Sequence, residues 1–95
     1  MKITTTGRSK AIRVSSGLHF INIDGVFDGT SVQIDWAKSC DADTWSPLLD
    51  EDGTATAITS TFNKQATLGQ GYVSFVATGG GTGPGISVDV NLSHL

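Results

Sequence analysis

The stretch Ile86-Ser87-Val88-Asp89-Val90-Asn91-Leu92 alternates apolar and polar side chains without a break. Its apolar members recur at every second residue, so an extended chain places them on one face and the polar members on the other. The stretch therefore predicts a β-strand with one face in the core and the other in solvent.

Two further segments show the same alternation. Residues 31–36 are expected to point Val32, Ile34 and Trp36 inward and Ser31, Gln33 and Asp35 outward. Residues 72–78 are expected to point Val73, Phe75 and Ala77 inward. Residues 18–23 differ, because they are apolar on both faces and include His19. They are expected to form a central strand covered on each side, with a neighbouring subunit as one candidate cover.

Weaker strands are expected at residues 12–14 and 55–59, and residues 61–68 are expected to hold at most one turn of helix. Within residues 1–8, the threonine-rich segment 3–6 is expected to form an edge strand or an N-terminal arm. The dipeptides Asp28-Gly29 and Asp52-Gly53 predict hairpin-type turns, because glycine accepts a positive φ. The glycine-rich run 79–85 is expected to be the tip of a terminal hairpin.

The composition agrees with an all-β chain. The 95 residues include 12 Gly, 12 Thr and 10 Ser but a single glutamate, Glu51, so the polar residues that line the wet face of a helix are scarce. We expect one domain over residues 1–95, an antiparallel β-sandwich or jelly-roll-like barrel of about seven to eight short strands.

Charge and cysteine content restrict the partners. The net charge is −3 and the chain has six basic residues, which are too few and too loosely spaced for a nucleic-acid interface. An acidic chain also matches an anionic membrane surface poorly, and no apolar run approaches the length of a signal peptide or a membrane span. Cys40 is the single cysteine, so the fold is expected to form without a disulfide, as suits a reducing cytosol.

Two groups of residues are candidate ligand sites. Acidic side chains cluster around one loop, and oxygen-rich loops can hold Ca²⁺. An EF-hand alignment on Gly53 fails, because Leu48 and Thr59 would take the first and last ligand positions. The glycine run lacks the lysine and the helix of a phosphate loop. No cofactor and no metal is expected, and solvated turn carboxylates are the preferred interpretation of Asp41, Asp43, Asp50, Glu51 and Asp52.

No catalytic constellation emerges from the spacing. His19 has Ser15, Ser16 and Asp24 near it in sequence, but no pattern arranges them as nucleophile, base and orienting group. His94 and Cys40 stand in no motif. Trp45, beside carboxylates, either caps the edge of the core or is exposed as a platform for a sugar ring or a protein contact. We therefore expect no enzyme and assign no catalytic, cofactor-binding or metal-binding residue.

Three stretches carry a resemblance to a known group of proteins: residues 25–36, which begin Gly25-Val26-Phe27-Asp28-Gly29, residues 43–48, and residues 68–76. Together they resemble the strand-and-turn pattern of small β-domains in virion proteins of tailed bacteriophages, over roughly residues 17–92. Such domains occur as capsid decoration (cement) proteins and as pieces of tail fibres, and they are commonly trimeric.

The resemblance implies a virion protein made in the host cytoplasm. Because the chain is short and compact, we expect a capsid decoration protein that forms a homotrimer and binds the major capsid protein or another virion protein. The alternative is a carbohydrate-binding or adhesion module of a tail fibre or spike. Nucleic acid and membrane are not expected as partners.

Overall fold

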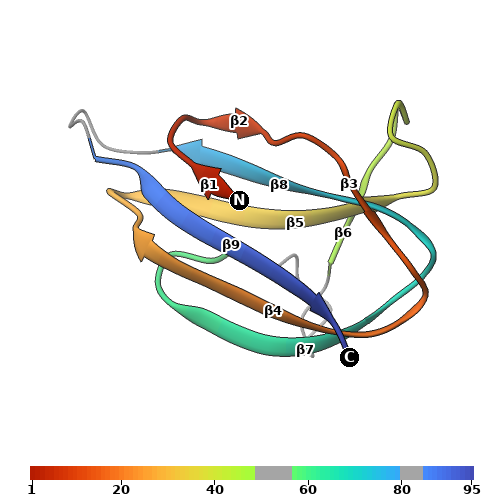
Figure 1. The fold of residues 1–95 in the computed structure, drawn as a ribbon. Coiled ribbons are helices and arrows are strands. Elements are labelled where there is room, and N and C mark those ends of the chain that lie inside the picture. Colours follow the sequence, from red (N-terminus) through yellow and green to blue (C-terminus); the bar gives the residue numbers. More distant parts are fainter. Residues whose placement is uncertain (49–56, 80–84) are drawn as a thin grey trace.

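The computed structural model describes residues 1–48, 57–79 and 85–95, and this part of the chain contains strands and no helix (Figure 1). The expected all-β fold is confirmed. The strands are β1 (Lys2–Ile3), β2 (Gly7–Arg8), β3 (Ile12–Val14), β4 (Gly17–Val26), β5 (Thr30–Ala37), β6 (Ser46–Pro47), β7 (Phe62–Leu68), β8 (Gly71–Gly79) and β9 (Ser87–His94).

The strands form two antiparallel sheets that pack face to face. Sheet A has the order β1-β9-β4-β7, and sheet B has the order β2-β8-β5-β6. β3 also pairs with β8, next to β2 on the same edge of sheet B. In Figure 1, β9 runs beside β4, and β5 runs beside β8.

The strand order is that of a jelly roll. Because β2 and β3 follow each other along the same edge of β8, they count as one interrupted strand. In chain order, sheet A then consists of the first, eighth, third and sixth strands, and sheet B of the second, seventh, fourth and fifth. This is the arrangement of two Greek keys folded over each other in a double-sheet sandwich.

The core lies between the sheets and follows the expected alternation. Val88 and Val90 of β9, Val32 and Ile34 of β5, and Val73, Phe75 and Ala77 of β8 are buried. Ile21 and Ile23 of β4 complete the centre from sheet A. Trp36 closes one end, where its indole N–H donates to the Gly69 carbonyl at 2.9 Å. A Cβ on Gly71 would lie 2.8 Å from the Trp36 ring, so this position accepts only glycine.

The turn at Asp28-Gly29 is confirmed, but it does not close a hairpin. Asp28 and Gly29 have φ values of 51° and 76°, and the Thr30 N–H donates to the Phe27 carbonyl at 2.9 Å. The strands on either side, β4 and β5, belong to different sheets. The turn therefore carries the chain from one layer to the other. Asp52-Gly53 lies outside the described residues.

The expected terminal hairpin is wrong for the same reason. β8 lies in sheet B and pairs with β5, whereas β9 lies in sheet A and pairs with β4 and β1. The connection between β8 and β9, of which residues 80–84 are outside the described part, thus crosses between sheets.

Residues 61–68, for which at most one turn of helix was expected, contain a strand that was not predicted. Residues 62–68 form β7, the outer strand of sheet A, paired with β4 from Gly17↔Leu68 to Ile23↔Phe62. Most β7 side chains are exposed, because an edge strand has a neighbour on one side only. The weak strand expected at residues 12–14 is β3, and of residues 55–59 the described part contains one bridge, Ile58↔Val32.

The N-terminal segment contributes to both sheets. β1 pairs with β9 in sheet A, and Ile3 is buried in the core. The chain then crosses to β2 in sheet B. The Met1 ammonium donates to the Val90 carbonyl at 2.9 Å. Residues 2–3 are therefore an edge strand of their own subunit and not a free arm.

Candidate functional site

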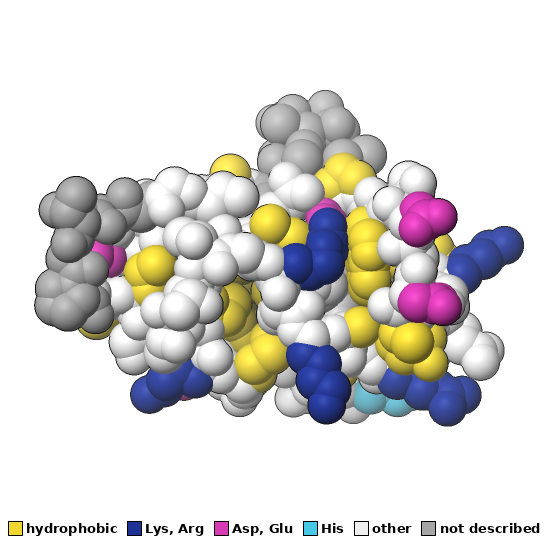
Figure 2. All heavy atoms as spheres, turned by 90° about the horizontal axis from the view of Figure 1, so that it is seen from above, with side chains coloured by type: hydrophobic (Ala, Val, Ile, Leu, Met, Phe, Trp, Pro, Cys, Tyr) yellow, Lys and Arg dark blue, Asp and Glu magenta, His cyan; other side chains and the backbone are white. Residues whose placement is uncertain are grey.

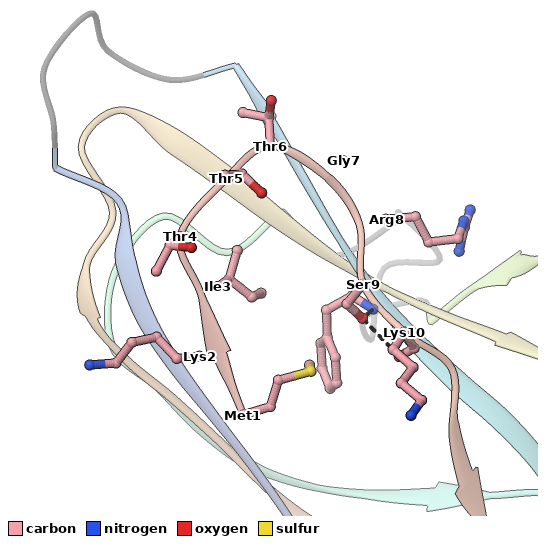
Figure 3. A pocket seen from close by; sticks show the side chains of 11 residues that line it. Met1, Lys2, Ile3, Thr4, Thr5, Thr6, Gly7, Arg8, Ser9 and Lys10 are labelled. Carbon is pink, nitrogen blue, oxygen red and sulfur yellow. Dashed lines mark hydrogen bonds between the residues drawn. The ribbon is translucent and has the colours of Figure 1, made fainter.

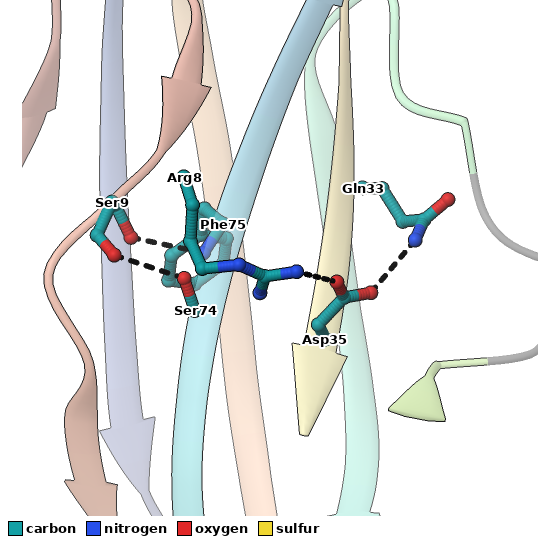
Figure 4. Close-up of polar contacts among 6 residues, drawn as sticks. All are labelled: Arg8, Ser9, Gln33, Asp35, Ser74 and Phe75. Carbon is teal, nitrogen blue, oxygen red and sulfur yellow. Dashed lines mark hydrogen bonds and ion pairs between the residues drawn. The ribbon is translucent and has the colours of Figure 1, made fainter. Parts of the chain in front are cut away.

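The outer face of sheet B carries a polar cluster centred on Asp35. The Arg8 guanidinium donates to one carboxylate oxygen at 2.9 Å, and the Gln33 amide donates to the other at 2.7 Å (Figure 4). The Asp35 side chain is 5% exposed. The expectation that Asp35 faces solvent is wrong, because β2 brings Arg8 over it from the far edge of the sheet.

Ser9 fixes the chain between β2 and β3 onto β8. Its backbone N–H donates to the Phe75 carbonyl at 2.8 Å, and its hydroxyl accepts the Phe75 N–H at 2.9 Å. The Ser74 hydroxyl donates to the Ser9 carbonyl at 3.0 Å (Figure 4). These bonds satisfy the backbone of β8 where its edge pairing is interrupted, so the cluster has a structural role.

Trp45 covers Arg8. The Arg8 Cζ atom lies 4.8 Å from the centroid of a Trp45 ring, within cation–π range. Trp45 is half-buried and does not belong to the hydrophobic core cluster. It neither caps the core edge, a place taken by Trp36, nor forms an open platform on both faces.

The acidic loop contains no metal site in the described residues. Asp41 and Asp43 are exposed, and no group of three or more His, Cys, Asp or Glu side chains in the described part is placed to hold a metal ion. The Ser39 hydroxyl donates to Asp41 and lowers the pKa of that carboxyl. Asp50, Glu51 and Asp52 lie outside the described residues, so the interpretation as solvated turn carboxylates stays a prediction there.

The two histidines form a pair that the sequence interpretation missed. Their rings stack with centroids 4.6 Å apart, and they are cross-strand neighbours on β4 and β9. His19 is 2% exposed, and its Nδ1 lies 3.1 Å from the Gly17 carbonyl oxygen. His94 follows Val88, Val90 and Leu92 at the same two-residue spacing, and this spacing was the sequence signal that could have predicted its inward direction.

The residues near His19 in sequence do not form a catalytic group with it. Ser15 and Ser16 are exposed in the link between β3 and β4. Asp24 is an odd number of residues from His19 on the same strand, so the two side chains point to opposite faces of sheet A. Cys40 is exposed and free.

A small cavity of about 200 Å³ lies beneath the N-terminal crossing. Residues 1–10 and Phe75 line it, and Figure 3 shows Lys2 directed away from Ile3. Three consecutive threonines, Thr4, Thr5 and Thr6, are among the lining residues. The crossing closes the gap between the two sheets at this edge.

The outer face of sheet A is open. All its outward residues are exposed or half-buried, and Leu18 is 41% exposed. Phe20 lies beside Leu18 among amide and hydroxyl side chains at one end of this face, and the charged residues Asp24, Asp89 and Lys2 lie towards the other end. Asn22 bonds to Asn63 and Asn91 across three strands. The neighbours across the ladder are Asn63, Gln65 and Thr67 of β7 and Asn91 and Ser93 of β9.

Figure 2 shows how charged side chains are distributed on the side of the molecule that carries β2. Viewed from the side of β2, Lys and Arg side chains stand at separate places with hydrophobic side chains between them, and acidic side chains gather towards one end. Separated basic groups do not form the continuous basic stripe of a nucleic-acid interface.

Comparisons with known proteins do not place the chain in a family. No family model, no curated protein and no solved structure matches it. In the described residues, no helix is long and apolar enough to cross a membrane.

Proposed function

We propose that this chain is a non-enzymatic structural protein of a phage virion, a capsid decoration protein that self-associates and stabilises the lattice it binds. The observation that carries the proposal is an open, uncharged area at one end of the outer face of sheet A. This area is formed by Leu18, Phe20 and Asn22, flanked by amides and hydroxyls, and the charged residues Asp24, Asp89 and Lys2 lie beyond it on the same face. Depletion of charge around apolar and aromatic groups is typical of the centre of a protein interface.

The jelly-roll order supports the same function. Double-sheet jelly rolls serve in viral capsids and in lectins. A fold alone does not assign a function, so the surface has to decide between these uses.

The size of the face supports a repeated, weak contact. The three long strands β4, β7 and β9, about 4.8 Å apart and with a rise of about 3.3 Å per residue, cover roughly 400 Å² over about eight residues. A standard stable interface buries about 800 Å² per partner. One such face therefore supports a weak self-association, and the several subunits of each oligomer then reach strong attachment to a lattice through avidity.

A trimer is the proposed assembly. Three copies arranged around a common axis satisfy each patch without open-ended growth. The N-terminal residues are not proposed as a clasp on a neighbour, because Ile3 is buried in its own core and β1 pairs with its own β9.

The test is co-sedimentation with empty capsids of the parent phage. Leu18→Lys places a charge on the open face of sheet A, and Thr78→Lys places the same charge at an exposed position of sheet B. We expect wild type and Thr78→Lys to pellet with capsids and Leu18→Lys to stay in the supernatant. Failure of wild-type protein to bind capsids would overturn the proposal.

The alternative is a carbohydrate-binding or adhesion module. Its expected platform, Trp45, has one face occupied by Arg8. A glycan array probed with wild-type protein and with Trp45→Ala separates the two functions, since only the alternative predicts glycan binding that depends on Trp45.

A further inference from the structure

A concavity of about 490 Å³ lies at the end of sheet B furthest from the Asp28 turn. It is lined by Arg13 of β3, Tyr72 and Gly71 of β8, Gln70 before β8, and Lys38 after β5.

The sheet register brings these residues together. Arg13 pairs with Tyr72 on one side, and Ala37 pairs with Tyr72 on the other, so Tyr72 stands between β3 and the end of β5. Lys38 follows Ala37 directly. At Gly71 a Cβ would lie 2.5 Å from the Ala37 carbonyl oxygen, so no side chain can fill the floor of the concavity there.

The polar side chains that line the concavity have no partner among the described residues. In the described part, Arg13, Lys38, Gln70 and Tyr72 make no side-chain hydrogen bond and no ion pair. Arginine and lysine donate only, and the amide and phenol can donate as well. The concavity thus offers many donors and a single aromatic ring to a ligand rich in acceptors.

The charge of the concavity opposes that of the chain. The net charge is −3, yet the lining holds two cations and no carboxylate. Arg8, by contrast, is already paired with Asp35. Two unpaired cations on an acidic chain favour an anionic ligand at this place.

We infer that this concavity binds a carboxylate-bearing sugar residue of an acidic polysaccharide. Arg13 and Lys38 hold the carboxylate, the Tyr72 ring packs against the sugar ring, and Gln70 bonds to a hydroxyl. An acidic peptide fits less well, because none of the five lining residues has an aliphatic side chain that would anchor an apolar peptide residue. The inference goes beyond the proposed function and does not depend on self-association.

The test is a titration of ¹⁵N-labelled full-length protein with trigalacturonate, followed by NMR. We expect the Gln70 and Gly71 amide signals to shift with saturation. Methyl-esterified trigalacturonate, which lacks the charge, should bind about tenfold more weakly or worse, because a charge-assisted hydrogen bond contributes roughly 1.5–3 kcal/mol.

Arg13→Gln is the test variant. Its control is Lys10→Gln, which neutralises another exposed cation that does not line the concavity. We expect trigalacturonate to bind Arg13→Gln about tenfold more weakly and Lys10→Gln as wild type. The inference is overturned by equal binding of the acid and its ester, by unchanged binding to Arg13→Gln, or by tighter binding of hexaglutamate. Displacement of trigalacturonate by an equal concentration of inorganic phosphate would also overturn it, since a generic anion site would then remain.

Discussion

The outer faces of the two sheets are built in opposite ways. On sheet B, Asp35 and Ser74 point outward yet are buried, because Arg8 bonds to Asp35, Ser9 bonds to Ser74, and Trp45 stacks on Arg8. On sheet A, every outward residue of β4, β7 and β9 is exposed or half-buried. The chain covers one face with its own segments and leaves the other to solvent or to a partner.

The two faces differ in the partners of their polar side chains. Those of sheet B are used internally, in an ion pair and in hydrogen bonds that fix the N-terminal segment. Those of sheet A bond mainly to each other along the surface, as in the Asn22, Asn63 and Asn91 row. Surface contact by sheet A therefore requires no rearrangement of the fold.

The largest effect is expected within β9, where core and solvent faces alternate. Val88→Asp places a carboxylate at a fully buried position and should cost roughly 4 kcal/mol or prevent folding. Asp89→Ser, on the open face of sheet A, should stay within about 0.5 kcal/mol. Urea denaturation followed by circular dichroism measures both, and similar midpoints would show that the register of β9 is wrong.

An intermediate effect is expected on the covered face. Asp35→Ala removes the acceptor for Arg8 and Gln33 and should lower the free energy of unfolding by about 2–3 kcal/mol. Gln65→Ala, at an exposed position of sheet A, should change it by less than about 0.5 kcal/mol. If both variants unfold at the same denaturant concentration, the two faces do not differ as described.

A smaller loss of stability is expected from replacing Trp45, which lies over Arg8. Trp45→Ala removes the ring over Arg8 but leaves the ion pair to Asp35, so about 1–2 kcal/mol should be lost. Trp45→Phe, which keeps an aromatic face, should recover about half of that. Thermal melts of the two variants check this prediction. A loss of stability from Trp45→Ala as large as that from Asp35→Ala would show that the ring over Arg8 matters as much as the ion pair beneath it, contrary to this account.

The sequence predicted strands where one face is continuously apolar. The alternation of β5, β8 and β9 placed Val32, Phe75 and Val88 in the core correctly. It missed β7, whose inward series Phe62, Ala66 and Leu68 is interrupted by the exposed Lys64 at the edge of the sheet.

The pairing of segments that are distant in the sequence could not be predicted from local patterns. A turn such as Asp28-Gly29 has the same local chemistry whether its strands share a sheet or enter different sheets, so the jelly-roll crossings were not foreseen. The burial of Asp35 depends on Arg8, 27 residues away, and the concavity at Tyr72 depends on two strand pairings at once. Neither the burial of Asp35 nor the concavity produces a pattern within a single segment of the sequence.

The most direct test of the account is the mass of the protein in solution, measured by sedimentation equilibrium over a range of concentrations. Leu18→Glu charges the open face of sheet A, and Thr78→Glu charges sheet B, both at exposed positions where the fold should tolerate the change to within about 0.5 kcal/mol. We predict a trimer for wild type and Thr78→Glu and a monomer for Leu18→Glu. A monomeric wild-type protein at all concentrations, or a trimer that survives Leu18→Glu, would contradict the assignment of this face to self-association.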